Sequence, residues 1–304
     1  MDNTNQVTQI SQVIRERIIA AQTEWDVKTQ SVRDQLQTLS NKLEKFEKEL
    51  GSNVRRPELE FANSSSAVEH GNSLTARIVE LKSELSLMGD RPRFHAADNI
   101  SAYIHSEEEM QGLQDDVAKG FAQVLNALVI DTENDHNTRE TNKRVAKMYI
   151  REVFSGRYLP EPKITEFPND RNLDEVIIIG PFRVRSACSH HFVPIIGSLW
   201  IGIKPGKSVA GLSKYGRLAE WILSRPHIQE EAIQMLADEL DKLIEPQGLI
   251  VSISAKHMCM SWRGIKDEAA TTTSVVRGEF RKNASMKSEF FEQVRVMQND
   301  PALR

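Results

Sequence analysis

The sequence predicts an α+β domain preceded by an all-α helical hairpin. Three observations indicate this fold class. Apolar residues near the N-terminus follow a heptad spacing, strand-like segments appear after about residue 170, and two amphipathic helical segments separate those strands. The chain has 304 residues, which is enough for two domains. We expect a helical extension over residues 1–98 and a second domain over residues 99–304.

The N-terminal extension has the apolar spacing of a coiled coil, and residues 7–50 contain no Pro or Gly. Gly51 should end this first helix, a polar stretch over 52–73 should follow, and a second helix should run from Leu74 to Met88. We expect the helices to form an antiparallel hairpin or to pair between chains, which makes residues 1–98 a contact for a coiled-coil partner. The alternative is a single solvated helix. Steps of three and four residues separate the apolar positions Val32, Leu36, Leu39, Leu43, Phe46 and Leu50.

The second domain should begin with helices and continue with strands. Ser106 and Glu109 have the spacing of a capping box, so a helix should start there and carry a broad apolar stripe to Leu128. A run of strands, a helix pair and a return strand then indicates an antiparallel sheet. The expected helices cover 144–154, 213–223 and 229–243, and the expected strands cover 175–188, 197–205 and 248–262.

Composition excludes several classes of protein. No apolar run approaches the ~20 residues that a membrane span needs, so we expect no membrane partner. The net charge of −4 gives no general attraction for nucleic acid, which is therefore not an expected partner. Only two cysteines occur, which fits a reducing compartment, and we expect a cytoplasmic protein.

Both cysteines lie beside histidines, which predicts a metal site. Cys188 occurs in S-A-C-S-H-H-F and Cys259 in A-K-H-M-C-M, and zinc prefers thiolate and imidazole ligands. Because side chains alternate along the strand expected over 248–262, His257 and Cys259 should share one of its faces. Spacing alone leaves open which of the two histidines after Cys188 would bind metal. The alternative is two buried cysteines with hydrogen-bonded histidines and no metal.

Cationic residues between the two cysteine segments predict an anion site. Ser213 and nearby cations lie near an expected helix start, where free backbone N–H groups favour an anion such as phosphate. The alternative for each cation is an ordinary charged side chain exposed to solvent on the surface. Glu230, after Gln229, could bind the edge of a guanine-like base, although a carboxylate at a helix start more often only stabilises the dipole. The cations between the two segments are Lys204, Lys207, Lys214, Arg217 and Arg225, and Arg263 follows Cys259 by four residues.

These segments together resemble the GTP cyclohydrolase I family. The motifs T-N-K-R-V-A-K-M-Y, C-S-H-H-F-V-P, G-L-S-K-Y-G-R, R-P-H-I-Q-E, K-H-M-C-M-S-W-R-G and T-T-T-S occur in the order of that family and with closely similar separations. The resemblance covers about two thirds of the chain, from Ser106 to the C-terminus, and leaves out the helical extension.

The resemblance implies a zinc enzyme acting on GTP. Zinc would activate water for attack on C8 of the guanine ring, and ring opening, loss of formate, ribose rearrangement and reclosure would give 7,8-dihydroneopterin triphosphate. This is the first step toward tetrahydrofolate, pterins or related deazapurines. The implied residues are Cys188, His191 and Cys259 for Zn²⁺; His190 and His257 for proton transfer; Ser213, grouped with these, at the ribose or phosphates; Glu230 and Gln229 at the guanine; and Lys147, Arg144, Lys214, Arg217 and Arg263 at the triphosphate.

The resemblance also implies the tunnelling fold, an antiparallel sheet with two helices on one side, assembled as a homodecamer of two pentamers with shared sites. One position departs from the family's C-E-H-H motif, because this chain has Ser189 in place of the glutamate. A missing carboxylate beside the zinc ligands could change the endpoint of the reaction. The alternatives are therefore a related hydrolase that stops at a ring-opened formamidopyrimidine-type product, and a non-catalytic scaffold that binds nucleotide.

Overall fold

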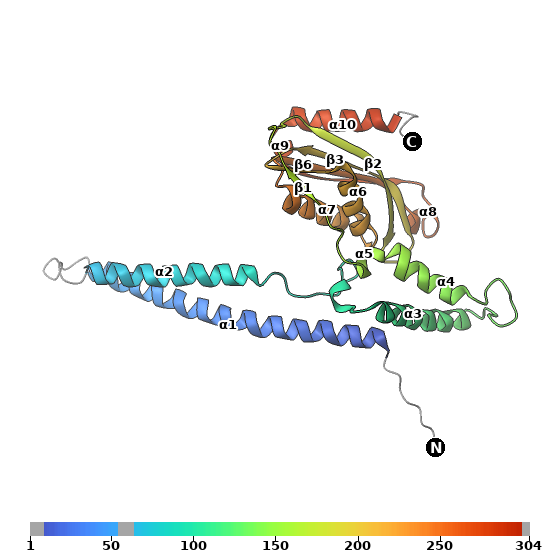
Figure 1. Ribbon diagram of the computed structural model, residues 1–304, viewed down its shortest axis with the longest axis horizontal. Helices are drawn as coiled ribbons and strands as arrows, with labels where there is room; N and C mark the ends of the chain where they lie inside the picture. The colour runs from blue at the N-terminus through green and yellow to red at the C-terminus, as the bar shows by residue number, and fades with distance from the viewer. Residues whose placement is uncertain (1–8, 54–63, 300–304) are drawn as a thin grey trace, which may run out of the picture. The chain divides into compact units, whose positions relative to one another are not determined.

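The computed structural model describes residues 9–53 and 64–299, which divide into two compact units (Figure 1). The smaller unit is Val13–Arg93. The larger unit runs from Phe94 toward the C-terminus and also takes the residues up to Gln12. The chain thus leaves the larger unit after Gln12 and re-enters it at Phe94. The boundary expected between residues 98 and 99 stays a prediction.

Two antiparallel helices form the smaller unit, α1 (Ile10–Asn53) and α2 (Ser64–Leu87). Phe46 near the end of α1 contacts the His70 ring near the start of α2, and Trp25 Nε1 donates to Gly89 O at 3.3 Å. Gly51 does not end α1, because one glycine costs a helix only about 1 kcal/mol. The polar stretch expected over 52–73 is wrong at residues 52 and 53, which belong to α1, and from residue 64 onward, where α2 begins. Its part over 54–63 lies outside the described residues, as does Val7.

The larger unit begins with a helical region. The helix α3 (Glu107–Ala127) starts at the predicted capping box, in which Ser106 Oγ accepts from Glu109 N at 3.2 Å. The single helix expected over 144–154 is instead three short segments: α4 (Thr141–Lys147), a π-helical stretch (Met148–Val153) and α5 (Ser155–Tyr158). A single 3-10 turn (Ser101–Tyr103) precedes α3. None of the helices in the described ranges is long and apolar enough to cross a membrane.

A five-stranded sheet forms the centre of the larger unit, with the strand order β5-β2-β3-β6-β7. All pairs are antiparallel except β2 with β5, which is parallel and so departs from the expected all-antiparallel sheet. The strands β1 (Glu166–Pro168) and β4 (Ser208–Ala210) pair separately. The main strands are β2 (Ile177–Cys188), β3 (Pro194–Lys204), β5 (Pro226–His227), β6 (Gly248–His257) and β7 (Ala270–Gly278).

Each face of the sheet packs against helices. The helices α6 (Leu212–Leu223) and α7 (Gln229–Ile244) cover one face, and their apolar residues form the main core with Leu199 and Ile253. The helix α10 (Ala284–Asn299), preceded by the short α9 (Glu279–Lys282), covers the opposite face through Phe290, which packs with Trp200 and Ile250 (Figure 1). Alternate residues of β6 thus enter different cores. The α+β class predicted from the sequence is confirmed.

Two arginines hold the segment where the chain re-enters the larger unit. Arg157 donates to the carbonyl oxygens of residues 94, 95, 96 and 98. Arg225 is buried, stacks on the Trp221 ring at 3.9 Å and donates to Ala97 O at 3.2 Å. Because carbonyl groups in a loop would otherwise need water, these bonds fix the backbone of 94–98.

We expect Gly197→Ala to destabilise the sheet strongly. A Cβ at Gly197 would lie 2.1 Å from Ser254 O and 2.5 Å from Ala255 Cα, so β3 and β6 would have to separate. The loss should exceed about 2 kcal/mol, as for other overpacked or strained core sites. Denaturant unfolding measures this.

The control is Gly120→Ala in the middle of α3, where an added Cβ meets nothing within 4 Å. This change should stabilise the protein by about 0.5–1 kcal/mol, because alanine favours helix over glycine. Equal effects of the two substitutions would contradict the described pairing of β3 with β6.

Candidate active site

A tight turn after β2 carries the first cysteine segment. Cys188 N donates to Val193 O at 3.0 Å and Phe192 N donates to Cys188 O at 2.8 Å, and Phe192 takes a left-handed φ of 55°. This turn places His190 Nδ1 3.6 Å from the buried Cys188 Sγ. Tyr149, from the π-helical stretch, donates to Phe192 O at 3.2 Å and supports the turn from outside. The structure therefore places His190 rather than His191 beside the thiol.

The second cysteine does not lie on a strand, so the prediction that His257 and Cys259 share one strand face is wrong. The strand β6 ends at His257, and Cys259 lies in the helical turn α8 (Met258–Ser261). The partner strands explain this end: β3 starts at Pro194 and its Ile195 pairs with His257, so no strand residue remains to pair with Cys259.

The helical turn still brings Cys259 next to Cys188. Burial raises the pKa of the Cys259 thiol, and the neighbouring Cys188 thiol raises it further, whereas Arg263 lowers it. Both cysteines are free. The two thiols and the two histidines of the turn therefore gather where β2 and β6 end and β3 begins.

Gln229 fixes the ring of His257. The amide nitrogen Nε2 lies 3.4 Å from Ile253 O, 3.2 Å from Thr271 O and 2.9 Å from Thr273 Oγ1. Because carbonyl oxygens only accept, the amide must point its nitrogen this way and its Oε1 toward His257 Nε2, which lies 3.0 Å away. His257 Nε2 then carries the proton and Nδ1 is the acceptor.

Two opposite effects act on the pKa of His257. Burial lowers the pKa of His257 below its ordinary value, and the negative charge of Glu230, the second residue of α7, acts against this. Glu230 itself is exposed and accepts no hydrogen bond from another side chain or backbone group within the described residues. Its carboxylate is thus available beside an imidazole.

His191 contacts a cation in this structure. Arg263 donates to His191 Nε2 at 2.9 Å. Since a guanidinium only donates, His191 is a neutral imidazole with its proton on Nδ1. Arg263 therefore lies at the cysteine cluster, four residues after Cys259.

The remaining predicted cations do not all reach this cluster. Ser213, Lys214 and Arg217 lie in the first turns of α6, with Ser213 and Arg217 exposed. Arg225 is buried against Trp221 instead of facing an anion. Its burial lowers its pKa to about 10.

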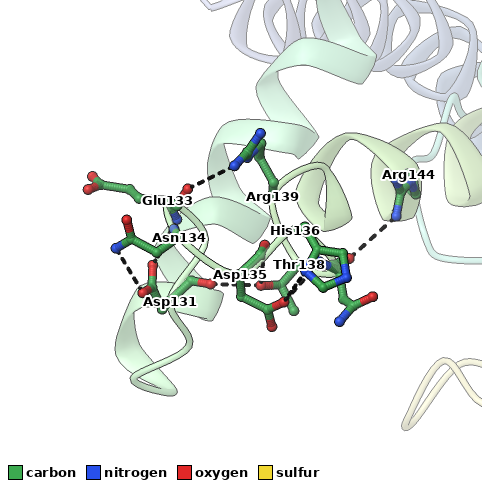
Figure 2. Close-up of polar contacts among 9 residues, drawn as sticks. Asp131, Glu133, Asn134, Asp135, His136, Thr138, Arg139 and Arg144 are labelled. Carbon is green, nitrogen blue, oxygen red and sulfur yellow. Dashed lines mark hydrogen bonds and ion pairs between the residues drawn. The ribbon is translucent and has the colours of Figure 1, made fainter.

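The helix α4 carries the last two predicted residues. Arg144 Nη1 lies 3.5 Å from Asn137 O and points back toward its own loop (Figure 2). That loop is held by Asp131, whose carboxylate accepts from Glu133 N and Asn134 N at 2.9 Å. Lys147, at the end of α4, is exposed and makes no side-chain hydrogen bond or ion pair in the described part of the chain. Within the described residues, neither side chain makes a hydrogen bond or ion pair with the cysteine cluster.

The side chains at this site are of the types that bind zinc, although they are not arranged around a metal position. Within residues 9–53 and 64–299, no three His, Cys, Asp or Glu side chains are arranged to hold a metal ion. Two adjacent thiols with an imidazole 3.6 Å from one of them are nevertheless the sulfur and nitrogen ligands that zinc prefers. One imidazole of the turn would have to rotate toward both thiols.

Sequence reasoning missed the groups that support these residues. Thr271 and Thr273 belong to the motif T-T-T-S, but nothing in their spacing showed that they would receive the Gln229 amide. Tyr149 was part of another motif and was not expected beneath the turn. Both contacts join segments that are far apart in the sequence, as the pairing of β6 with β7 does. Such contacts leave no local signal in the sequence.

Known proteins match the larger unit. The sequence profile of GTP cyclohydrolase I matches residues 117–295. GTP cyclohydrolase 1 of Erwinia tasmaniensis is 38% identical over 181 residues, which cover 59% of this chain and 81% of that protein. GTP cyclohydrolase 1 of Escherichia coli O1:K1 / APEC is 35% identical over 207 residues, covering 67% and 88%. The solved structure of an archaeosine synthase QueF-Like protein aligns with a TM-score of 0.27 at 13% identity, over 33% of this chain and 91% of its own.

We expect Gln229→Met to destabilise the protein by about 1–3 kcal/mol, because it removes a buried amide that hydrogen-bonds to β6, β7 and His257. Denaturant unfolding measures the loss. The ring ¹⁵N shifts of His257 should also change as Nε2–H loses its acceptor.

Gln234→Met is the matched control on the same helix. Gln234 is exposed and donates only to Asp238 Oδ1 at 3.3 Å, so its replacement should change stability by less than about 0.5 kcal/mol. Equal losses for both variants would contradict the role given to the Gln229 amide.

Proposed function

The chain belongs to the GTP cyclohydrolase I family, and we propose that it hydrolyses and rearranges GTP to 7,8-dihydroneopterin triphosphate and formate. The observation that carries this proposal is the gathering of two thiols and two histidines at one end of the sheet, with His257 held beside them by Gln229. A binding scaffold has no need of an imidazole with one fixed tautomer.

We propose that Cys188, Cys259 and one imidazole of the turn hold zinc. The family resemblance selects His191, which would exchange its contact with Arg263 for the metal, whereas proximity to the thiol favours His190. When bound, zinc would supply Lewis acidity toward water and the purine C8. The release of Arg263 would free its guanidinium for a phosphate.

His257 would exchange protons with the substrate at Nδ1, because Nε2–H is committed to Gln229 Oε1. An imidazole suits a step that both takes and returns a proton. The histidine of the turn that does not bind metal, His190 by resemblance, would be the second proton carrier.

Glu230 would hold the guanine edge. An exposed carboxylate accepts two hydrogen bonds from the adjacent N1–H and N2–H groups of guanine. Gln229 was expected to help, but its amide is already bonded to β6, β7 and His257. Its contribution would therefore be to place Glu230, its neighbour, and His257.

The triphosphate would bind to Lys214, Arg217 and Arg263, with Ser213 at the ribose or phosphates. Lys147 and Arg144 would reach the same phosphates from a neighbouring copy, because neither makes a hydrogen bond or ion pair with the cysteine cluster of its own chain in the described residues. This sharing supports a homo-oligomer, which we propose is a decamer of two pentamers with the tunnelling fold. Two free thiols are consistent with the proposed cytoplasmic location.

Ser189 favours one alternative product. Its hydroxyl cannot supply the negative charge of the glutamate found in the family motif, so the reaction could end at a ring-opened formamidopyrimidine-type nucleotide. Mass and fluorescence of the product separate the two reactions, since only the reclosed pterin is fluorescent after oxidation. The proposed pathway is pterin, folate or deazapurine synthesis.

The zinc-loaded protein should convert GTP to a product that becomes a fluorescent pterin after oxidation and dephosphorylation. Cys259→Ala should lose bound zinc and reduce turnover by more than about 100-fold, because the loss of a ligand exceeds the 10–100-fold effect of outer partners. Metal analysis and chromatography measure both.

Ser261→Ala is the control in the same helical turn, where Ser261 Oγ makes long contacts with His257 O at 3.4 Å and with Met258 Sδ at 3.5 Å. It should keep its zinc and most of its activity. Unchanged GTP with the zinc-loaded wild-type protein would rule out both enzymatic reactions and leave the nucleotide-binding scaffold.

A chain that begins at Phe94 should fold and retain turnover, because the sheet, its covering helices and the cysteine cluster all lie after this residue. Its stability should be lower by about 1–2 kcal/mol, since Asp116 Oδ2 loses the 3.0 Å bond from Ser11 N. Circular dichroism and the pterin assay test this. An insoluble or inactive product would make the helical extension part of the catalytic assembly.

A further inference from the structure

A cavity of about 340 Å³ lies along α6 and the adjoining part of β2. From β2 it is lined by alternate arginines, and from α6 by Ser213 and Arg217. Gly216 forms part of its wall, where an added Cβ would lie 3.0 Å from Phe182 Cε1. The full lining is Phe182, Arg183, Arg185, Ser213, Gly216, Arg217, Ala219, Glu220, Leu223 and Ser224.

Three arginines meet at this cavity without a partner. Arg183, Arg185 and Arg217 are exposed and make no hydrogen bond or ion pair within residues 9–53 and 64–299. Arg277 of the larger unit, in contrast, is paired with Asp238 and Asp241. Glu220 also lines the cavity but forms no ion pair with the three. Three guanidinium groups thus remain uncompensated around one hollow.

The strand pattern explains why two arginines reach the same place. Arg183 and Arg185 are alternate residues of β2 and share one face, while Val184 between them is buried in the main core. On its other edge β2 pairs with β5 only at Ala187 and Cys188, so residues 183–185 lie at a free edge of the sheet. Charged residues also protect free edges, but that purpose does not require a third arginine from α6.

Phosphate chemistry matches this lining. A guanidinium presents a planar fork of donors that binds phosphate oxygens in pairs, and several unpaired arginines suit a ligand with several charges. Ser213 adds a hydroxyl at the same cavity, and the first turn of α6 adds free backbone N–H groups. Neither Arg183 nor Arg185 belongs to a motif that carries the family resemblance.

We propose that Arg183 and Arg185 bind the triphosphate chain of the nucleotide in this cavity, together with Arg217 and Ser213. This extends the proposed function, because Ser213 and Arg217 are already expected at the substrate. The two strand arginines would make the protein select triphosphates over monophosphates. The base and C8 would remain at the cysteine cluster.

The test compares two double variants of the full chain that remove the same charge. Arg183→Gln/Arg185→Gln alters the cavity, and Arg171→Gln/Lys287→Gln alters exposed cations that do not line it. Dissociation constants for GTP, GMP and inorganic tripolyphosphate are measured by calorimetry at several salt concentrations, with the pterin assay in parallel.

The cavity variant should bind GTP and tripolyphosphate at least about 10-fold more weakly, with a shallower salt dependence, and should bind GMP within about 3-fold of the wild-type protein. Tripolyphosphate should compete with GTP. The control variant should bind all three as the wild-type protein does.

Equal weakening in both double variants, equal weakening of GTP and GMP, or tripolyphosphate that binds without competing with GTP would overturn the proposal. Failure of the proposed function is a separate result: GTP would then bind in an arginine-dependent way without giving a pterin. Normal pterin formation with unchanged GTP affinity in the cavity variant would overturn this inference alone. Wild-type protein that binds neither GTP nor tripolyphosphate would also overturn it.

Discussion

The geometry of the site depends on one buried amide. Gln229 joins the start of α7 to β6 and β7 through its nitrogen and orients His257 through its oxygen. Because the acceptors of β6 and β7 determine which way the amide points, the pairing of two strands also determines which nitrogen of His257 carries the proton. Strand register, the helix start and proton transfer are therefore coupled at a single side chain.

The sequence predicted those parts of the structure that depend on local patterns. The start of α3 at the Ser106 capping box, the strands β2 and β3 and the helices α6 and α7 all follow from spacing. The interruption of the helix after Lys147 and the end of β6 at His257 were not predicted. Both depend on distant partners, since the strand ends where its neighbour begins at Pro194 and the π-helical stretch packs beneath the turn after β2.

The site shows the same division. Residue types and motifs selected the cysteines and histidines, but not which imidazole lies beside which thiol, because a rotation of one side chain decides that contact. The arginines give a second example of this division. Arg225 looked like an anion ligand by position and proved to be buried against Trp221, while Arg183 and Arg185 attracted no attention in the sequence and line a cavity. Burial and pairing, which a sequence does not display, separate these cases.

The path of the chain gives the helical extension an unusual attachment. Residues up to Gln12 and from Phe94 onward belong to the same unit, and the second attachment is secured by Arg157 and Arg225. In topological terms the two long helices are an insertion and not a tail. A tail fixed at one end can swing without cost to its domain, whereas an insertion closes a loop, so its two ends must keep a fixed separation. A change in the distance between those two ends would therefore strain the larger unit. Arg225, which holds the second end, is separated from Gln229 by only three residues of the chain.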